Sequence, residues 1–572
     1  MSAVPPNQER STWARPDPKT GRPTFEWTTT RSDITDTVRL IAGPFNALPV
    51  IFVPGIMGSN LKNKETGSPV WRLDTTFGEP FGLAGGMAMK GAGDRQRILH
   101  PERCEVDREG AIPKKPAGSV SNPERYRERG WGSVGQGSYH EFLLWLEEQL
   151  NPAQRNPALW LDYFQAEATV SAPPAPHAQP KLFPGIKMGM KGEPFGAEKQ
   201  PFFPIMTDDL MARAKFLMPV YAEGYNWLDS NQKAAEKLQV RIGEIINEWN
   251  KGEFRCEQVI LVTHSMGGLV ARACAQLPGM ADKIAGIVHG VMPAVGAAVA
   301  YRRCKVGMRD ESFIAGLVIG STGKEVTAVF AQAPGALQLL PTQGYRPGWL
   351  RVHDAQGKTV LKLPANDSDP YTSIYGEKDS WWGLINQAWL RPEGGDPITW
   401  EDYDDFLGLA RKFHEKLSSH YHPNTFAYYG SDPKHKSFEN VIWRVKSGIA
   451  PDDGTAKPNV ASVLSMKPSQ LRMDGSSPEY VGGTLEVIST IDYTHTYESS
   501  HWELHCEMQD GIGDGTVPHS SGAAPLAQGG ASIQQQFKLA GFDHEKSYKN
   551  GVAQRATLFA INKIAGTAKR TA

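Results

Sequence analysis

The sequence predicts an α/β fold, with a mostly parallel sheet flanked by helices and with large insertions. Two observations carry this prediction. Residues 216–289 read strand, helix, strand, helix, strand, which is the order of elements that builds a parallel sheet. Elsewhere, long stretches of the sequence lack this regular alternation of strands and helices. A structureless connection of such length is unusual within a compact domain, so we assign these stretches to insertions.

The core is expected to be discontinuous in the sequence. We assign residues 63–212 to a first cap insertion and residues 301–420 to a second one. The remaining segments are an N-terminal tail or cover at 1–45, core at 46–62, 213–300, 421–447 and 481–566, and an irregular excursion at 448–480.

Composition argues against several classes of protein. The 572 residues carry 61 basic and 62 acidic side chains, so nothing indicates the clustered positive charge that favours nucleic acid. Five widely spaced cysteines without a CxxC pair argue against a disulfide framework. The N-terminal stretch lacks the apolar region of a secretory signal peptide, and no run reaches the ~18 apolar residues of a transmembrane segment. We therefore expect synthesis in the cytoplasm without a signal peptide.

The first core strand is predicted at Leu48–Val53, and the turn Pro54–Asn60 follows it. A Gly-bearing turn after an early parallel strand can supply a backbone N–H that stabilises an oxyanion. We expect that donor to be Met57, with Ile56 as the alternative. Seen alone, the same turn fits an ordinary loop equally well.

The first insertion contains one convincing helix, predicted at Ser138–Glu148. A second stretch, Lys181–Met206, mixes Phe, Met, Ile and Pro with Lys. We interpret it as a loop that packs its aromatic side chains on the core, with a membrane-facing lid as the alternative.

A tight strand-to-helix turn is predicted around Ser265. The buried strand Val259–Thr263 precedes it, and two glycines allow the following helix to start at once. The segment Thr263–Gly267 matches the G-x-S-x-G nucleophile elbow except at its first position, where Thr replaces Gly. In such an elbow the Met266 N–H is the other oxyanion donor. The alternative is a plain turn in which the serine caps the helix.

The second insertion is predicted to contain an apolar cap. Its apolar stretches are Ser312–Gly320, Val326–Phe330 and Ala336–Pro341, which suit an acyl chain or, equally, form buried helices without a ligand. The tryptophans of this insertion are interpreted as core anchors and not as a membrane-interface belt. They are Trp381, Trp382, Trp389 and Trp400.

The last third of the chain supplies further strands and a closing helix. Phe426–Gly430 and Ile533–Leu539 are predicted as core strands, Asn440–Val445 as a strand of a hairpin or extension, and Leu485–Ile491 as another strand. A final helix is expected at about Tyr548–Ile564.

Chain order selects the partners of Ser265. Hydrolases built on this elbow carry the nucleophile, then an acid, then a histidine, with the last two on loops after late strands. Asp514 lies in a Gly-rich loop, and of the 15 histidines only His519 and His544 follow it. His519 is too close to Asp514 to belong to the next loop, whereas His544 follows a strand-like run. We therefore predict a triad of Ser265, Asp514 and His544 on an α/β-hydrolase fold.

Several of these polar residues have competing interpretations. Asp514 either completes the triad or caps a Gly turn, and the loop Asp510–Asp514 resembles a calcium site only weakly, because Ile512 occupies the third position of the EF-hand pattern. We interpret His264 as a buried neighbour of the nucleophile and His289 as a structural residue.

A remaining group of histidines forms either a metal cluster or, as we favour, a solvated loop. The group consists of His414, His420 and His422. No metal or other cofactor is expected for the chemistry at Ser265.

Six motifs together resemble one family of lipases. They are IFVPGIMGSNL, PVYAEGYNW, VTHSMGGLVAR, GIVHGVMPAVGAAVAYRR, APGALQLLP and GDGTVP. The chain resembles lipases related to GPI inositol deacylases and lecithin:cholesterol acyltransferases, in particular the antibacterial type VI secretion lipase effectors with a GPI-deacylase-like domain. The motifs span residues 48–545 discontinuously and cover the insertions poorly. On this resemblance Ser265, Asp514 and His544 match the family's triad, and the PGIMG turn matches its oxyanion loop.

The resemblance implies hydrolysis of acyl esters of membrane phospholipids. It also implies delivery into the periplasm of a rival cell by a type VI secretion protein, and a cognate immunity protein that binds the site. A phospholipase or lipase is the first interpretation, and an esterase or acyltransferase acting on small substrates is the second. The third is a catalytically inactive interaction module on a hydrolase fold.

Overall fold

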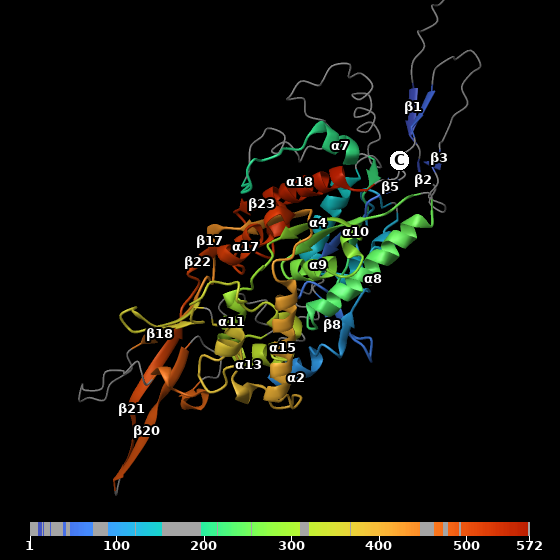
Figure 1. Cartoon of the computed structure of the whole chain (residues 1–572). Coiled ribbons are helices and arrows are strands. Elements are labelled where there is room, and N and C mark those ends of the chain that lie inside the picture. The colour runs from blue at the N-terminus through green and yellow to red at the C-terminus, as the bar shows by residue number, and fades with distance from the viewer. Residues whose placement is uncertain are drawn as a thin grey trace, which may run out of the picture.

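The computed structural model contains a central α/β core with a second sheet beside it (Figure 1). Near the N-terminus it describes β1 (Arg10–Trp13), β2 (Arg15–Pro16), β3 (Pro23–Thr24) and β4 (Val38–Ile41). The other described residues are 46–72, 90–120, 122–151, 196–213, 215–252, 254–308, 320–366, 368–446, 463–472, 479–490 and 493–569.

The central sheet has six strands, and all neighbouring strands in it are parallel. Across the sheet they are β11 (Val220–Ala222), β6 (Val50–Val53), β12 (Val259–His264), β13 (Ile284–Gly290), β16 (Thr425–Gly430) and β23 (Ile533–Leu539). Because the strands are parallel, the loops after their carboxyl ends meet at one edge of the sheet, where sites form in such folds.

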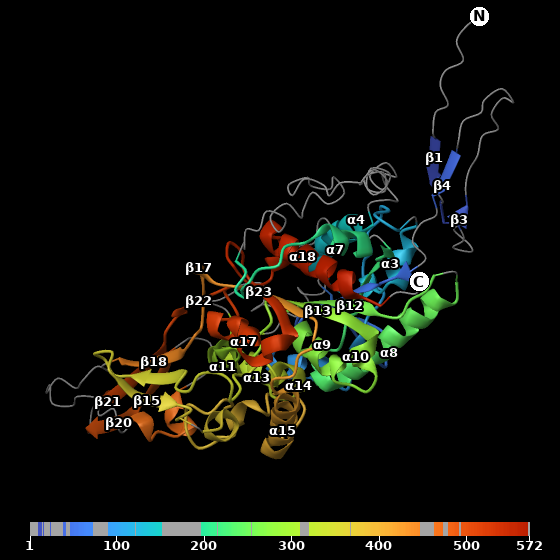
Figure 2. The ribbon, with the colours of Figure 1, turned by 45° about the horizontal axis from the view of Figure 1, so that its top comes forward.

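Helices cover both faces of this sheet, which confirms the predicted α/β architecture (Figures 1 and 2). One face packs against α8 (Asn231–Asn250) and α9 (Gly267–Ala275). The opposite face packs against α4 (Gln136–Leu150) and α18 (Gly551–Thr567). Successive residues of each strand point to opposite faces, so strands buried on both sides are apolar throughout.

The predicted helix of the first insertion belongs to this core. α4 follows β6 and precedes β11 in the chain, and it buries Phe142, Leu143 and Leu146 against the sheet. The 63–212 segment therefore contributes a crossover helix to the core as well as loops. Most of the stretch Lys181–Met206 lies outside the described residues, which resume at residue 196.

The second insertion packs helices beside a six-stranded second sheet. The helix α11 (Ala298–Val306) leads from the core into this insertion, whose helices include α13 (Gly323–Phe330), α14 (Pro334–Leu337) and α15 (Trp400–Leu417). The sheet runs in the order β15 (Thr359–Leu363), β14 (Leu350–His353), β18 (Val441–Lys446), β21 (Tyr493–Cys506), β20 (Glu479–Thr490) and β19 (Leu471–Arg472). The β20–β21 hairpin projects from the body of the molecule (Figure 1).

Several expectations for this insertion are confirmed. Val326–Phe330 lies in α13 and is buried, Trp381 and Trp389 are buried as core anchors, and Trp382 and Trp400 are half-buried against the same core. The indole N–H of Trp381 donates to the Val463 carbonyl at 2.9 Å. The apolar stretch Ser312–Gly320 lies outside the described residues except for its last residue.

Shorter elements complete the described chain. They are β5 (Asn46–Ala47), β7 (Leu61–Asn63), β8 (Pro69–Trp71), α2 (Ala92–Ile98), β9 (Cys104–Val106), α3 (Glu124–Glu128), η1 (Trp131–Ser133), α7 (Thr207–Arg213), β10 (Phe216–Leu217), α10 (Met280–Lys283), η4 (Tyr371–Tyr375), η5 (Gln387–Trp389), β17 (Asp432–Ser437), η6 (Pro468–Gln470), β22 (Gly511–Gly513), α17 (His519–Gly529), η7 (Gly530–Ser532) and η8 (Ser547–Lys549). Among the described helices, none combines the length and the apolar character needed to span a bilayer.

Candidate active site

Ser265 stands in the sharp turn between β12 and α9. Its φ angle is 51°, a left-handed conformation that is uncommon for a residue other than glycine. The Ser265 N–H donates to the carbonyl of Gly290 on β13 at 2.9 Å, which holds the turn against the sheet. A Cβ atom on Gly267 would lie 2.4 Å from the carbonyl oxygen of Val53, so only glycine allows the elbow helix to approach β6 this closely.

The three residues predicted as a triad lie in one hydrogen-bonded chain. His544 Nε2 is 2.8 Å from Ser265 Oγ, and His544 Nδ1 is 2.9 Å from Asp514 Oδ2. The other carboxylate oxygen, Oδ1, accepts the N–H groups of Val517 at 2.7 Å and Thr516 at 3.1 Å. The Asp514 side chain is 1% exposed, so both of its oxygens have fixed partners in a site shielded from water. This arrangement can move a proton from the serine to the imidazole and stabilise the resulting imidazolium.

Two loops after late strands bring the acid and the base to the serine. Asp514 directly follows β22, and His544 follows β23, the edge strand of the central sheet. The backbone N–H of His544 donates to the Asp514 carbonyl at 2.7 Å, which ties the two loops together. His519 lies apart from this chain, and its Nδ1 is 3.0 Å from Ser431 Oγ.

Thr263, the residue that departs from the elbow pattern, makes two contacts in the core. Its hydroxyl shares a hydrogen bond of 3.0 Å with Nδ1 of His289 on the neighbouring strand. Its carbonyl accepts the hydroxyl of Tyr548 at 2.8 Å. Burial, reinforced by the charges of Arg272 and His422, lowers the pKa of His289 to about 3. The hydroxyl of Thr263 thus gives a neutral buried imidazole a partner that glycine could not provide.

The PGIMG turn lies directly against the elbow. A Cβ atom on Gly55 would lie 2.9 Å from His264 Nδ1 and 3.0 Å from Ser265 Cβ. Met57 adopts a φ angle of 64°, and its carbonyl accepts the indole N–H of Trp71 at 2.7 Å. Within the part of the chain that the structure describes, neither the Met57 N–H nor the Met266 N–H donates to a protein acceptor. The predicted oxyanion donors are thus two amides without a protein acceptor in the described chain.

Two residues of this region were not predicted as functional. The Tyr139 hydroxyl lies 3.0 Å from His264 Nδ1, and His264 Nε2 lies 2.9 Å from the backbone carbonyl of His544. His264 was expected to be a buried neighbour of the nucleophile, which its 3% exposure confirms. Nothing in the spacing of Tyr139 marks it, because its contact spans 125 positions of the sequence.

The solvated loop that we favoured for the three histidines is wrong for two of them, because His414 lies half-buried in α15 and His422 is buried, whereas His420 is exposed. His414 Nε2 is 2.7 Å from the Gln338 carbonyl oxygen, and His422 Nε2 is 3.3 Å from that of Ala281. Asp510 Oδ1 accepts two backbone N–H groups, from Glu439 at 3.0 Å and from the residue after it at 2.9 Å. In the described ranges, no three His, Cys, Asp or Glu side chains are grouped as metal ligands would be.

Comparisons with known proteins match the chain to a domain family and to a solved structure. Residues 228–307, which include β12, the elbow and β13, match the family model of the PGAP1-like alpha/beta domain. A solved structure, the crystal structure of the Tle4-Tli4 complex, matches with a TM-score of 0.68 and 29% sequence identity, covering 92% of this chain and 99% of that chain. No curated protein sequence matches significantly. The two matches confirm the α/β-hydrolase fold class and the resemblance to GPI-deacylase-like lipase effectors that the motifs indicated.

Proposed function

We propose that this chain, with its PGAP1-like α/β domain and its likeness to Tle4, is a serine lipase that hydrolyses acyl esters of membrane phospholipids. One observation carries the proposal. The carboxylate of Asp514, the imidazole of His544 and the hydroxyl of Ser265 form an unbroken hydrogen-bonded chain at the carboxyl edge of the sheet. A buried serine with this pair of partners is activated for attack on a carbonyl carbon.

The proposed reaction begins with acyl transfer to Ser265. As Oγ attacks the ester carbonyl, His544 Nε2 takes the hydroxyl proton, and Asp514 holds the imidazolium that forms. The negative oxygen of the tetrahedral intermediate faces the N–H groups of Met57 and Met266. Collapse breaks the ester C–O bond, and the leaving alcohol takes the proton from His544.

Water completes the cycle in the second half of the reaction. His544 takes a proton from the water as its oxygen attacks the acyl-enzyme, and the fatty acid leaves as Ser265 recovers its proton. An oxyanion donor contributes about 2.7–4 kcal/mol to such steps. No metal or cofactor is needed for this sequence, since the chain itself supplies the base and the oxyanion donors.

The biological setting follows from the same likeness. The matched solved structure is a complex of Tle4 with Tli4, and on that basis we propose that this chain has a partner of the same kind, a cognate immunity protein. We further propose that the chain is a type VI secretion effector that a delivery protein carries into the periplasm of a target cell. The motif set quoted above supports this assignment.

Two other activities fit the same fold. An esterase or acyltransferase acting on small substrates would use the same three residues, and an inactive interaction module would use none of them. Turnover of phospholipid vesicles should be compared with turnover of short-chain p-nitrophenyl esters. A lipase hydrolyses the vesicles more efficiently. Hydrolysis of the short esters alone would favour an esterase. Transfer of the acyl group to an added alcohol would favour an acyltransferase. The absence of a reaction with any of these substrates would favour the inactive module.

A further inference from the structure

We propose that Tyr139 and His264 are positioning residues that join the turn carrying one oxyanion donor to the loop carrying the catalytic histidine. The inference rests on the proposed function, because it assigns these residues to the same reaction. It also gives the first insertion, from which Tyr139 comes, a part in catalysis. Neither residue touches the reacting atoms, and both act through the backbone of the two loops.

We call the hydrogen-bonded path from Gly55 through Tyr139 and His264 to His544 the connection. Its partners determine which atom donates and which accepts in each hydrogen bond. The carbonyl of His544 can only accept, so Nε2 of His264 carries the proton and donates to it over 2.9 Å. In a neutral imidazole Nδ1 is then an acceptor, and the Tyr139 hydroxyl donates to it over 3.0 Å. The Tyr139 oxygen in turn accepts the N–H of Gly55 over 3.2 Å. The connection therefore runs without interruption from the PGIMG turn to the His544 loop.

Burial keeps this connection in a single protonation state. Tyr139 is 4% exposed and His264 is 3% exposed. Burial, together with the nearby charge of His544 when it is protonated, lowers the pKa of His264 to about 3. Burial also raises the pKa of the Tyr139 hydroxyl well above its ordinary value. His264 thus stays neutral while His544 gains and loses its proton, so the carbonyl of His544 keeps its donor throughout the cycle.

The surrounding residues are shaped to admit the Tyr139 hydroxyl. A Cβ atom on Gly58 would lie 2.6 Å from that oxygen, and one on Gly55 would lie 2.9 Å from His264 Nδ1. The Tyr139 ring packs on Phe52 of β6, with ring centroids 4.9 Å apart. The two glycines of the PGIMG turn therefore leave the space that Tyr139 and His264 need to lie against the turn.

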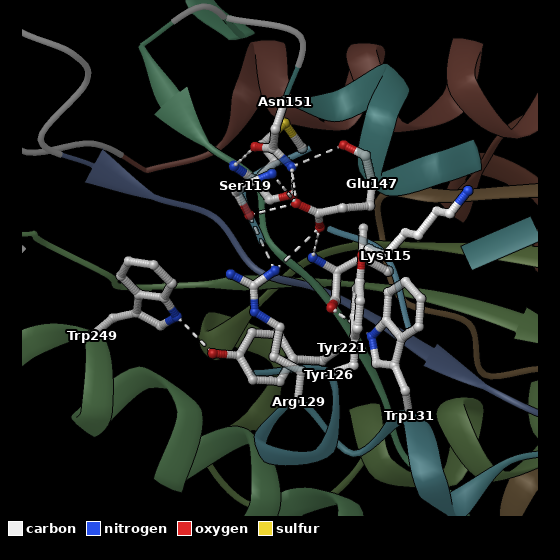
Figure 3. Close-up of polar contacts among 11 residues, drawn as sticks. Lys115, Ser119, Tyr126, Arg129, Trp131, Glu147, Asn151, Tyr221 and Trp249 are labelled. Atoms are coloured by element: carbon white, nitrogen blue, oxygen red, sulfur yellow. Dashed lines mark hydrogen bonds and ion pairs between the residues drawn. The ribbon is translucent and has the colours of Figure 1, made fainter. Parts of the chain in front are cut away.

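A buried carboxylate holds the helix that carries Tyr139. Two turns along α4, Glu147 accepts the N–H of Val220 on β11 at 2.8 Å and the N–H of Ser119 at 2.6 Å. Arg129 pairs with the same carboxylate at 3.3 Å, and Figure 3 shows Arg129 and Ser119 beside Glu147. Because Glu147 is fully buried and has several donors, α4 is fixed to the sheet edge, and the position of Tyr139 is fixed with it.

The first test removes the Tyr139 hydroxyl and keeps the ring. Tyr139→Phe should lower kcat by roughly 10- to 100-fold with little change in KM, because the loops shift while substrate contacts remain. Tyr126→Phe is the matched control, since Tyr126 is a buried tyrosine of the same insertion whose hydroxyl donates to the Lys115 carbonyl at 3.2 Å, outside the connection. Its kcat should stay within about twofold of the wild type, because the hydrogen bond that it loses does not join the two loops. Thermal melts of both variants report whether the fold is intact.

The second test compares two replacements of His264. His264→Gln keeps a side chain that can accept from Tyr139 and donate to the His544 carbonyl, whereas His264→Leu can do neither. The glutamine variant should therefore retain at least about tenfold more of the wild-type kcat than the leucine variant. A merely structural role for His264 would lower the melting temperature of both variants and leave their kcat values alike.

A third measurement needs no turnover. Nitrogen-15 NMR of histidine side chains should show His264 as the neutral Nε2–H tautomer in the wild type, with a shifted Nδ1 resonance in Tyr139→Phe. Wild-type kcat in a folded Tyr139→Phe, or an Nδ1–H tautomer, would overturn the inference and leave the lipase assignment standing. A wild-type chain that cleaves no ester would overturn the proposed function and the catalytic part of the inference, while the tautomer still tests the connection itself.

Discussion

His544 Nε2 lies 2.8 Å from Ser265 Oγ, although 279 positions separate the two residues in the sequence. The parallel sheet accounts for this proximity. Ser265 follows β12 and His544 follows β23, and both strands present their carboxyl ends at the same edge. The loop that ends at Asp514 reaches the same point and completes the chain.

The choice between the two late histidines gives a first prediction. His544→Ala should lower kcat by roughly 10⁴-fold or more, because the serine loses its base. The kcat of His519→Ala should stay close to that of the wild type, since His519 forms a hydrogen bond with Ser431 and not with Ser265. Initial rates on one ester substrate check both. Loss of activity in His519→Ala together with an active His544→Ala would require the triad to be reassigned.

The acid of the triad gives a second prediction. Asp514→Asn should lower kcat by roughly 10⁴-fold with a nearly unchanged melting temperature, because an amide favours the wrong tautomer of His544. Asp510→Asn is a control in the same loop, because Asp510 Oδ2 accepts the side-chain amide of Asn440, away from Ser265, and the NH2 group of an asparagine could not accept it. That variant should lose stability and keep its kcat. Equal kcat values for the two variants would contradict the role of Asp514.

Thr263 gives a third prediction. Thr263→Val should lower the free energy of unfolding by about 1–3 kcal/mol, because His289 Nδ1 is left buried without its partner. Among the described residues His289 Nε2 has no partner either, so the imidazole would have none. Thr263→Gly, which restores the usual elbow residue, should also destabilise the chain. Denaturant titration checks both, and a glycine variant more stable than the wild type would show that the hydroxyl contributes nothing.

Three histidines give a fourth prediction, on pH. Burial is the main cause that lowers the pKa to about 3 for His264 and His289 and to about 4 for His414, against about 6.5 in an unfolded chain. Between the lowered pKa values and pH 6.5 the unfolded chain binds more protons than the folded chain. The stability that the three neutral histidines allow is therefore complete above pH 6.5 and is lost as the pH falls. Each histidine contributes up to about 1.4 kcal/mol per pH unit.

Urea titrations between pH 7.5 and pH 5 measure this effect. The unfolding midpoint should fall over that range, and it should fall less steeply in His414→Gln, which removes one of the three groups far from Ser265. A midpoint that is independent of pH would contradict the assignment of neutral buried imidazoles.

The sequence predicted those parts of the fold that depend on local pattern. The strand and helix around Ser265, the strand before His544 and the helix at Ser138–Glu148 all have strong periodicity, and each is present as β12, α9, β23 and α4. Chain order selected Asp514 and His544, and the structure brings both into one hydrogen-bonded chain with Ser265, because the fold fixes where the loops after late strands meet.

Other relationships depend on contacts between distant segments, which periodicity does not report. α4 lies within a segment without regular alternation, so its place on the central sheet could not be read from spacing. The same holds for Tyr139, whose hydroxyl meets His264 through a contact over 125 positions, and for the partner of Thr263 on the next strand. Glycine is usual at the Thr263 position, and only the neighbouring His289 explains the exception.

The most direct test of the account is analysis by mass spectrometry of the lipids produced from defined phospholipid vesicles by the wild type and by Ser265→Ala. The wild type should release free fatty acid and lysophospholipid, and Ser265→Ala should release neither above the background of vesicles alone. Fatty acid release by Ser265→Ala at the wild-type rate would contradict the claim that Ser265 is the nucleophile.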